Sequence, residues 1–442
     1  MNGYQYNEGE IMKIPPPPEH ISSVLTQLAE AGYSAYLVGG CVRNAIMGRP
    51  VHDWDIATSA TPIDLARLFP KTVQTGEKFG TVTVVLPECP VEVTTFRTES
   101  EYNDGRHPDN VEFVSNIDED LSRRDFTINA IAQSADGELI DLFGGLQDIV
   151  DGVIRCVGGA NTRFGEDALR MFRAFRFSAE LGFTIEPETM GAICANADRA
   201  KLISADRIRV ELAKTLMTQK PEIAGEMIKL GLLDRFVTVS GKSPEGLERI
   251  AELPVEENMR GCVFCAILLE RGLITSVTEF LREMQLAGKA AKMALRALRI
   301  TDFPKDRTAI KRLLAKHGPE IVRIAAAVSD VLDAGVPVAM SNKMVLLDDK
   351  ATVLLQHGDM HSDEADNSEK SNALKLTDEI IASGECLHLG DLAISGSDLI
   401  ELGHPPGKEL GDMLNKLLNH VFEHPKDNTR EALLKLAVTV HG

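Results

Sequence analysis

The sequence predicts an α+β protein, in which an N-terminal domain with a mixed β-sheet and helices precedes a long all-helical region. Between residues 33 and 157, β-branched and apolar runs typical of strands alternate with segments of helical periodicity. After about residue 160 the strand signals nearly vanish, and helical segments separated by glycine and proline follow one another. The chain is therefore expected to hold a sheet domain followed by a helical array.

Composition narrows the class of protein. Hydrophobic residues make up 44% and charged residues 26%, which is ordinary for a globular protein. No apolar run is long enough to cross a membrane, and the polar N-terminus does not resemble a secretory signal. Seven scattered cysteines predict reduced thiols in the cytoplasm. The net charge of −19 argues, by itself, against a nucleic-acid partner, although phosphate binding requires only a local basic surface.

The N-terminal elements can be predicted in order. Residues 1–18, which end in Pro15–Pro18, are expected to be a leader, and a helix at 19–31 ends at Gly32. Residues 135–158 predict a polar hairpin followed by a glycine-rich exit. The predicted strands are SAYLVGG (34–40), TVTVVLP (81–87), VEVTTFR (91–97) and NVEFV (110–114), and the helices between them are CVRNAIMG (41–48) and TPIDLARLF (61–69).

The later elements are predicted as helices. One helix is expected over GEDALRMFRAFRFSAELGF (165–183), and an exposed acidic loop over 357–371. Cys262 and Cys265 lie in an apolar helical run with no second cysteine pair, which favours core packing over a structural zinc site. Further helices are predicted at 205–217, 221–233 and 276–286.

An aspartate pair is the first candidate for chemistry. Asp53 and Asp55 are separated by one residue, so on a strand both carboxylates would point to one face and share a divalent cation. Mg²⁺ suits such a pair, because it binds few carboxylates and completes its octahedron with water and substrate phosphates. The alternative is an acidic strand at a solvated sheet edge.

A glycine pair lies upstream of the aspartates. Gly39 and Gly40 end a strand and open a helix, so bare backbone N–H groups and Arg43 can meet a phosphate there. A phosphate site ten residues before a two-carboxylate metal site indicates nucleotidyl transfer with two metals. Glu92, on a neighbouring predicted strand, is the best candidate for a third carboxylate, although an ordinary strand-edge acid explains it equally well.

Four motifs together resemble one family. They are LVGGCVRNAIMGRPVHDWDIAT (37–58), EVTTFRTESEYNDGRHPDNVEFV (92–114), DLSRRDFTINAIA (120–132) and the segment 165–183. In order and spacing they resemble the class II tRNA nucleotidyltransferases, the CCA-adding enzymes, which share a polymerase-β-like core with bacterial poly(A) polymerases. The resemblance implies a catalytic head at 19–157, a helical neck at 158–220 for nucleotide selection, a helical body at 221–335 and a tRNA-binding helical tail at 336–442.

The resemblance also implies roles for individual residues. Arg124 would bind the nucleotide, and Arg123 is the less favoured of the two. The polar loop 97–111 would serve the switch from C to A addition. For Arg207 and Arg209 two roles stay open, tRNA binding and stabilisation of the neck fold. The remaining implied roles are triphosphate contact for Gly40 and Arg43, metal binding for Asp53 and Asp55, and nucleotide selection for Asp167, Arg170, Arg173 and Arg176.

Base selection can also be argued from side-chain chemistry. On one helix, Asp167 and Arg170 at i and i+3 would be neighbours. Cytosine and adenine both present an amino donor beside a ring-nitrogen acceptor, which a carboxylate and a guanidinium match, whereas uracil and guanine present the reverse. Arg173 and Arg176 would brace Asp167 or meet phosphates. The alternative is an amphipathic helix with Leu169, Phe172 and Phe175 inward and a solvated arginine stripe.

The sequence thus predicts addition of C, C and A to tRNA 3′ ends from CTP and ATP, with Mg²⁺ as cofactor and release of pyrophosphate. The tRNA would be bound through backbone and shape, by a cytoplasmic monomer or homodimer with no membrane partner. The alternatives are an A-adding enzyme or poly(A) polymerase on the same core, and a catalytically inactive RNA-binding protein. Asn44 replaces the aspartate usual in the family, and we expect it to adjust ion pairing near Arg43 without abolishing catalysis.

Overall fold

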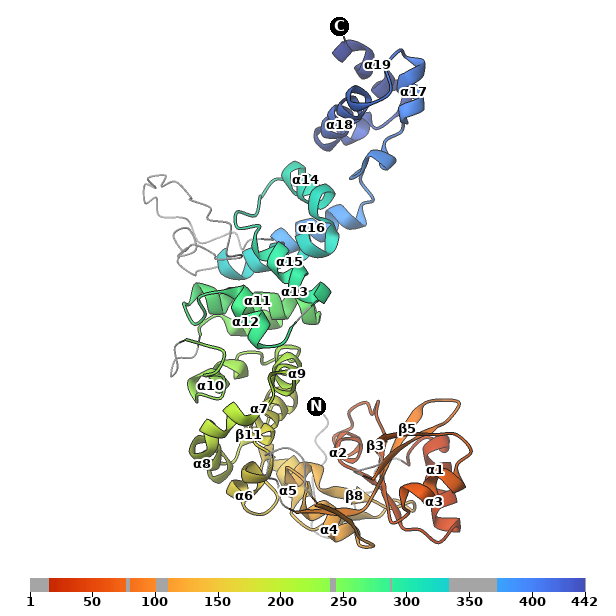
Figure 1. Ribbon diagram of the computed structural model, residues 1–442, viewed down its shortest axis with the longest axis vertical. Coiled ribbons are helices and arrows are strands. Elements are labelled where there is room, and N and C mark those ends of the chain that lie inside the picture. Colours follow the sequence, from red (N-terminus) through yellow and green to blue (C-terminus); the bar gives the residue numbers. More distant parts are fainter. Residues whose placement is uncertain are drawn as a thin grey trace. The chain divides into compact units, whose positions relative to one another are not determined.

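The strand-like runs of the N-terminal part form a mixed sheet in the computed structural model, which describes residues 16–76, 80–100, 110–238, 244–286, 288–333 and 372–441. Among these residues the sheet has seven strands in the order β3-β4-β5-β2-β1-β8-β9 (Figure 1). Only β2 and β5 pair in parallel, and the other neighbours are antiparallel. The strands are β1 Ala35–Val38, β2 Asp55–Thr58, β3 Thr72–Gly76, β4 Thr81–Val85, β5 Pro90–Thr95, β8 Ile131–Gln133 and β9 Leu139–Asp141.

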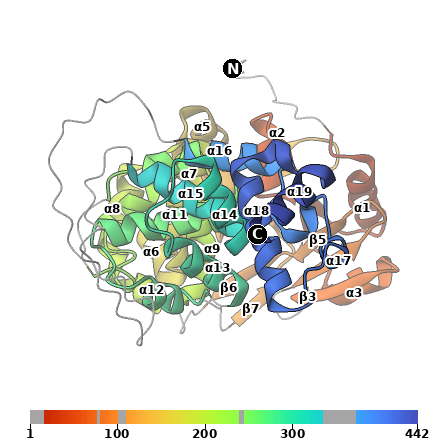
Figure 2. The same ribbon diagram turned by 90° about the horizontal axis from the view of Figure 1, so that it is seen from above.

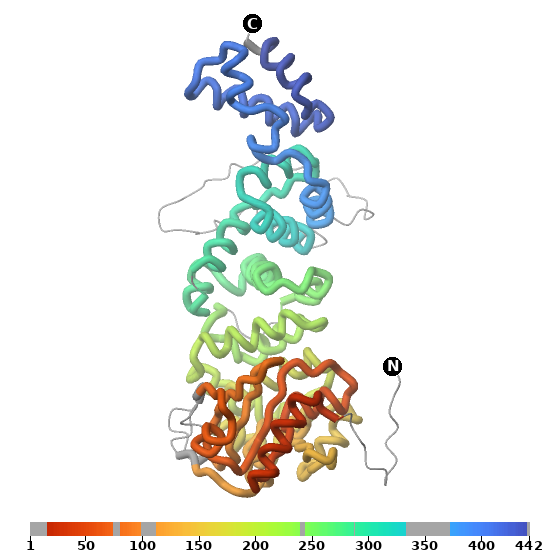
Figure 3. Tube along the Cα trace, turned by 90° about the vertical axis from the view of Figure 1, so that its right-hand side faces the viewer, coloured from red at the N-terminus to blue at the C-terminus, as the bar shows by residue number. Residues whose placement is uncertain are grey.

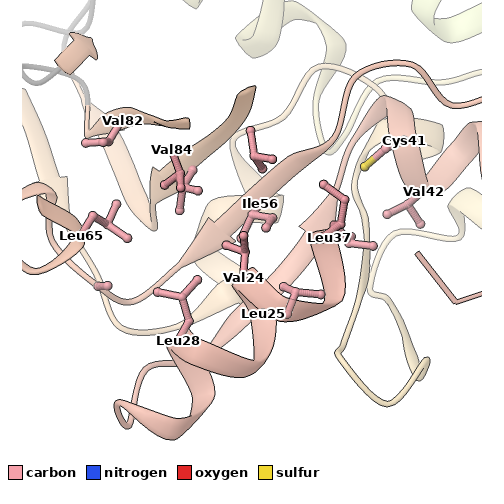
Figure 4. Close-up of a cluster of buried hydrophobic side chains, with 14 of the residues drawn as sticks. Val24, Leu25, Leu28, Leu37, Cys41, Val42, Ile56, Leu65, Val82 and Val84 are labelled. Carbon is pink, nitrogen blue, oxygen red and sulfur yellow. The ribbon is translucent and has the colours of Figure 1, made fainter. Parts of the chain in front are cut away.

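Three helices cover one face of this sheet. They are α1 Glu19–Glu30, α2 Gly40–Ile46 and α3 Pro62–Leu68, and their apolar side chains pack with Leu37 and Ile56 (Figure 4). The next residues along those strands, Val38 and Ala57, belong to a second cluster on the opposite face. Because side chains alternate along a strand, Asp55 lies on the face away from α1 and α3.

Several predicted boundaries differ in the structure. β2 begins at Asp55, so Asp53 precedes the strand and is not part of it. The predicted hairpin is confirmed by β8 and β9, but the glycine-rich exit contains helix α5 Gly145–Asp151, flanked by Gly144 and Gly152 at positive φ. The loop 97–111 is shorter than predicted, because β6 Arg97–Ser100 pairs with β7 Asn110–Phe113. The leader up to residue 15, the segment 101–109 and the acidic segment 357–371 lie outside the described residues.

The helices that follow the sheet break where a single helix was predicted. Helix α6 ends at Glu166 and α7 begins at Leu169, with Asp167 between them in an extended conformation (φ −140°, ψ 105°). A short parallel pair, β10 Val153–Ile154 and β11 Thr184–Ile185, ties this region back to the sheet domain. The helices here are α4 Ile117–Ser122, α6 Ala160–Glu166, α7 Leu169–Leu181, α8 Pro187–Asn196, α9 Ala205–Leu216 and α10 Ile223–Lys229.

The chain divides into two compact units, one up to Arg235 and a second formed mainly by Pro244–Gly442. The described part of the second unit is all helix, and Figure 3 follows it from α11 to α19. Its helices are α11 Glu257–Glu270, α12 Val277–Glu283, α13 Gly288–Leu298, α14 Arg307–His317, α15 Pro319–Asp333, α16 Ala373–Ala382, α17 Gly396–Glu401, α18 Lys408–Glu423 and α19 Arg430–His441.

The cysteine pair of the second unit belongs to its core. Cys262 and Cys265 are free thiols buried in α11, and burial raises the pKa of Cys265 to about 12. Both side chains are among the buried core residues, which confirms core packing for this pair. Within the described ranges no group of three or more His, Cys, Asp or Glu side chains is arranged to hold a metal. In the same ranges, each helix is too short or too polar to cross a bilayer.

Candidate active site

A glycine turn joins β1 to α2 at the edge of the candidate site. Gly39 adopts φ 75° and ψ −134°, a conformation that favours glycine. A Cβ atom there would lie 3.0 Å from Nη1 of Arg124 and 3.9 Å from Oδ2 of Asp55. The sequence placed the phosphate contact at Gly40, but Gly39 is the residue whose backbone requires glycine, and it brings the turn against Arg124 and Asp55.

The candidate carboxylates converge through the register of the sheet. Asp55 on β2 is the direct partner of Glu92 on the parallel strand β5, and Asp53 lies two residues upstream. Burial raises the pKa of Asp55, the charges of Glu92 and Asp53 raise it further, and the nearby Arg124 lowers it. The three acids thus form a repulsive group that has Arg124 as a cationic neighbour.

A pocket of about 650 Å³ opens beside these acids, within the range typical of small-molecule sites. It contains every residue to which a nucleotide or metal role was assigned, with the exception of Glu92. Its charged lining comprises Arg43, Asp53, Asp55, Arg123, Arg124, Asp125, Asp167, Arg170, Arg173, Arg176, Glu180, Arg207 and Lys214.

All seven arginines of the pocket lie within ion-pair distance of a carboxylate. Asp120 is buried and accepts hydrogen bonds from both Arg123 and Arg124, so the two neighbouring arginines share one anchor. Hydrogen bonds and charge from the two guanidiniums hold the pKa of Asp120 below its usual value although burial acts to raise it. The remaining pairs are Arg43–Glu180, Arg170–Glu166, Arg173–Asp125, Arg176–Glu211 and Arg207–Asp167.

Arg43 is held by amides as well as by charge. Its Nε and Nη2 atoms donate to Oδ1 of Asn44 at 3.2 and 2.9 Å, and its Nη1 atom donates to Oδ1 of Asn129. The amide of Asn129 in turn donates to Asp125 at 3.2 Å, and Asp125 accepts a hydrogen bond from Arg173 at 2.8 Å. Asn44 therefore keeps the acceptor that an aspartate would supply and leaves Arg43 with Glu180, 3.9 Å away, as its ion-pair partner.

Asp167 and Arg170 both line the pocket, but they do not share a helix. Asp167 precedes α7 and accepts the backbone N–H of Leu169 at 3.0 Å, so its side chain contacts the first residue of the helix on which Arg170 lies. Its carboxylate also receives two hydrogen bonds from Arg207 of α9, at 3.1 and 2.7 Å. Arg170 pairs with Glu166 and donates to the carbonyl of Arg123 at 3.0 Å. The role of Arg207 stayed open in the sequence analysis, and in the structure its guanidinium holds the carboxylate of Asp167 in place.

The alternative of an amphipathic α7 with a solvated arginine stripe is wrong. Leu169, Phe172 and Phe175 are buried as that alternative expected, but Arg170 and Arg176 are buried too. Arg176 pairs with Glu211 of α9 and Glu180, both at 2.6 Å. The helix is therefore enclosed on both its apolar and its cationic sides.

Sequence reasoning missed one aromatic side chain of the pocket, Phe177. The guanidinium carbons of Arg176, Arg43 and Arg173 lie 3.9, 5.0 and 5.3 Å from its ring centroid, within the range of cation–π attraction. Phe177 follows the same helical face as Arg173 at i+4, which is the signal that could have found it. Asp125, Asn129 and Glu211 were missed because their partners are distant in sequence, and Asp120 was missed because its burial depends on the tertiary fold.

The donor set fits a divalent cation. Asp53 and Asp55 offer hard oxygen ligands, and burial beside a second and third carboxylate makes the charge of Asp55 costly without a cation. Among the described residues no three such side chains are arranged to complete a metal site alone. Further ligands would therefore be water and substrate phosphates, as is usual for Mg²⁺.

Three family models match the chain. The model of the poly A polymerase head domain matches residues 35–155, which span the sheet, the glycine turn and the carboxylates. The model described as a probable RNA and SrmB-binding site of polymerase A matches 182–238, and the putative domain 2 of tRNA nucleotidyltransferase matches 263–437. The fold and the pocket thus define a nucleotidyltransferase.

Relatives and solved structures narrow this class. The CCA-adding enzyme of Limosilactobacillus fermentum is 35% identical over 436 residues, which are 97% of this chain and 98% of that one. The crystal structure of the Bacillus stearothermophilus CCA-adding enzyme in complex with CTP has a TM-score of 0.71 and 32% identity, and covers 97% of this chain and 98% of that one. The Thermotoga maritima CCA-adding enzyme complexed with tRNA-CCA shares the fold, with a TM-score of 0.59 at 21% identity over 98% and 97% of the two chains. The chain belongs to the CCA-adding enzyme family of tRNA nucleotidyltransferases.

Proposed function

We infer that the protein adds C, C and A to the 3′ end of tRNA, taking the nucleotides from CTP and ATP and releasing pyrophosphate. The observation that carries this conclusion is the match at 35% identity over nearly the whole of a CCA-adding enzyme. Its substrates are therefore tRNA, CTP and ATP. Because tRNA and nucleoside triphosphates meet in the cytoplasm of bacteria, we propose that location.

We propose that the first unit binds the nucleotide in its 650 Å³ pocket. The triphosphate would meet the N–H groups after Gly39, together with Arg43 and Arg124. Nε of Arg124 is buried without a hydrogen-bond partner among the described residues, which supports a further contact there. The terminal ribose hydroxyl of tRNA forms a new bond to the α-phosphorus, and the bond from that phosphorus to pyrophosphate breaks.

We propose that Asp53 and Asp55 hold Mg²⁺ and that Glu92 completes the acidic group. When bound, the cation supplies positive charge to the phosphate oxygens and to the attacking hydroxyl. The carboxylates would hold the cation at the beginning of β2, where the strand register places Glu92 beside Asp55.

We propose that Asp167 and Arg170 select the base. The carboxylate of Asp167 accepts from the exocyclic amine of cytosine or adenine, and the guanidinium of Arg170 donates to the ring nitrogen. Uracil and guanine present the reverse pattern and leave both groups mispaired. Arg207 and Glu166 orient the two selecting side chains, and Arg173 and Arg176 secure α7 against Asp125 and Glu211.

An incorporation assay tests this function. The protein is incubated with tRNA that lacks the last three nucleotides, with CTP alone, ATP alone or both. We expect two additions with CTP and three with both nucleotides. Addition of A without C would establish the A-adding or poly(A) alternative, and the absence of any addition would indicate an inactive RNA-binding protein. Asp53→Ala serves as the inactive control, and a fully active Asp53→Ala variant would contradict the metal assignment.

A further inference from the structure

The ring of Phe177 gathers three guanidinium groups in the pocket of the first unit. Arg43 reaches it from α2, and Arg173 and Arg176 reach it from α7, the helix to which Phe177 itself belongs (Figure 2). The two helices are distant in sequence, and the three cations repel one another. Their meeting at a single apolar ring therefore requires a local explanation.

The ring has a fixed place in the fold. Phe177 is only 4% exposed, and its ring meets that of Phe126 nearly at right angles, at 85°, with 5.9 Å between the centroids. Phe126 is fully buried, and its backbone N–H donates to Asp125 at 2.8 Å. Since the ring of Phe177 is covered in this way, it offers no surface on which a nucleotide base could stack. Its contacts in the pocket are with cations.

Two of the three arginines are also held by short ion pairs. Nη2 of Arg173 lies 2.7 Å from Asp125, and Nε of Arg176 lies 2.6 Å from Glu211. Both carboxylates are buried. Hydrogen bonds between charged groups are the strong ones, so these carboxylates fix Arg173 and Arg176 independently of the ring.

Arg43 depends more on neutral groups. Its ion-pair partner Glu180 lies 3.9 Å away, and its N–H groups donate to the amide oxygens of Asn44 and Asn129. The N–H groups of a guanidinium lie in its plane, so these bonds hold its edges. The ring of Phe177, whose centroid is 5.0 Å from the guanidinium carbon, covers it from above. The ring therefore supplies the contact that the amides cannot supply.

The ring also offsets the cost of a charge at this position. Burial lowers the pKa of Arg43, and the charge of Arg176 acts in the same direction, whereas the charge of Glu180 opposes them. The negative face of an aromatic ring attracts a guanidinium, and the attraction is stronger when water is excluded. Phe177 thus stabilises Arg43 where a neighbouring cation repels it.

We propose that Phe177 is a positioning residue for the triphosphate of the incoming nucleotide and that it acts through Arg43. This inference rests on the proposed function, in which Arg43 meets the triphosphate. Because α7 also carries Arg170, the ring links the position of the triphosphate site to that of the base-selecting pair. A weaker ring should therefore impair the binding of a nucleoside triphosphate and spare that of a monophosphate.

The test weakens the attraction of the ring and keeps its shape. Full-length protein is made with monofluoro-, trifluoro- or pentafluorophenylalanine at position 177, because fluorine withdraws electrons from the face of the ring. The matched control carries the same residues at Phe172, which is fully buried on the same helix and has no cation over its ring among the residues that the structure describes. Dissociation constants for CTP and CMP are measured by equilibrium dialysis, together with the melting temperature of each protein.

We expect the dissociation constant for CTP to rise with each step of fluorination at Phe177. With pentafluorophenylalanine the increase should reach about tenfold, the equivalent of about 1.4 kcal/mol. Binding of CMP, which lacks the β- and γ-phosphates, should not change with fluorination, and neither nucleotide should distinguish the Phe172 series from the wild type. In an Arg43→Gln background, fluorination of Phe177 should no longer affect CTP, because the coupling requires both partners.

Each contrary result has a defined meaning. Unchanged CTP binding across the Phe177 series would overturn the positioning role and leave the proposed function intact. An equal loss of CMP binding would show that the ring supports the pocket as a whole, and a fluorination effect that persists in Arg43→Gln would show that it does not act through Arg43; either result overturns the proposal. Wild-type protein that binds CTP but adds no nucleotide to tRNA would overturn the proposed function and leave the binding comparison interpretable.

Discussion

Replacing Arg207 by alanine tests how Asp167, the carboxylate that we propose selects the base, is positioned. Arg207 donates two hydrogen bonds to Asp167, at 3.1 and 2.7 Å, and the two side chains are 21% and 17% exposed. The substitution leaves Asp167 with its bond to the N–H of Leu169 and with no arginine brace. The carboxylate then turns more freely at the point where it must meet the amine of cytosine or adenine.

The size of the effect follows from the two lost bonds. A hydrogen bond to a charged group contributes about 1.5–3 kcal/mol, and the partial exposure of this pair places its combined contribution near the lower end, at about 2 kcal/mol. At about 1.4 kcal/mol per tenfold change, kcat/KM for CTP should fall by about 30-fold. UTP gains nothing from an ordered Asp167, so the ratio of CTP to UTP incorporation should fall by about the same factor.

The assay compares kcat/KM for CTP and UTP on tRNA that lacks its last three nucleotides. Arg209→Ala is the matched control, because Arg209 lies on the same helix and, among the residues that the structure describes, forms an ion pair with the exposed Asp206 alone. Arg207→Lys should recover part of the selectivity by restoring one charged donor. An Arg207→Ala variant that keeps the wild-type ratio would refute the bracing role of Arg207 and the selecting role of Asp167 together.

Four other substitutions give separate tests. Gly39→Ala should reduce incorporation at least 100-fold, measured at saturating CTP, because φ is 75° and the new Cβ would meet Arg124 at 3.0 Å. Asp55→Asn should abolish incorporation, yet without Mg²⁺ its melting temperature should equal or exceed that of the wild type. The pKa of Asp55 is raised in the folded state, so at a pH above the ordinary pKa of aspartate the ionised Asp55 lowers the stability of the fold. Added Mg²⁺ should stabilise the wild type more than the variant. Asn44→Asp should change the dissociation constant for CTP by less than about threefold in a binding titration, because Arg43 already donates twice to the Asn44 oxygen and already has Glu180 as an ion-pair partner. Burial acts to raise the pKa of Glu385, but hydrogen bonds from Arg307, Lys311 and Ser383 lower it to about 2. Glu385→Gln should therefore lower the free energy of unfolding, measured in urea at pH 7, by about 3 kcal/mol. The difference from the wild type should shrink as the pH falls from about 4.5 toward 2.

Local signals in the sequence predicted the sheet domain well. Alternating apolar residues identified β1, β4 and β5, and the prediction of Asp55 and Glu92 on neighbouring strands is confirmed, whereas Asp53 lies just before its strand. These features depend on residues that are close in sequence or on a strand period of two. The comparisons with known proteins confirmed the family and the α+β fold that the motifs predicted.

Local sequence patterns could not predict the interactions that depend on the tertiary fold. The break between α6 and α7 was missed because Gly165–Phe183 has an unbroken helical pattern, whereas Asp167 leaves that pattern to reach Arg207 from α9. The glycines beside α5 were interpreted as part of a glycine-rich exit, although at positive φ they delimit a helix. The anchor Asp120 is close in sequence to Arg123 and Arg124, but its burial depends on the tertiary fold.

The pairing of every pocket arginine with an acid has a consequence for how errors are avoided. Because Asp120, Asp125, Glu166, Glu180, Glu211 and Asp167 already pair with these cations, a nucleotide bound as we propose would displace internal contacts at most of them, and the unpartnered Nε of Arg124 would be the exception. The protein's own carboxylates would thus compete with every nucleotide for the pocket arginines, at an effective concentration that the fold determines. Under the proposed roles of Asp167 and Arg170, a base that matches both side chains would overcome this competition, and a base that does not match them would fail to do so. These carboxylates would therefore act as an intramolecular competitive inhibitor, and they would lower the binding of a mismatched nucleotide more than the binding of a matched one.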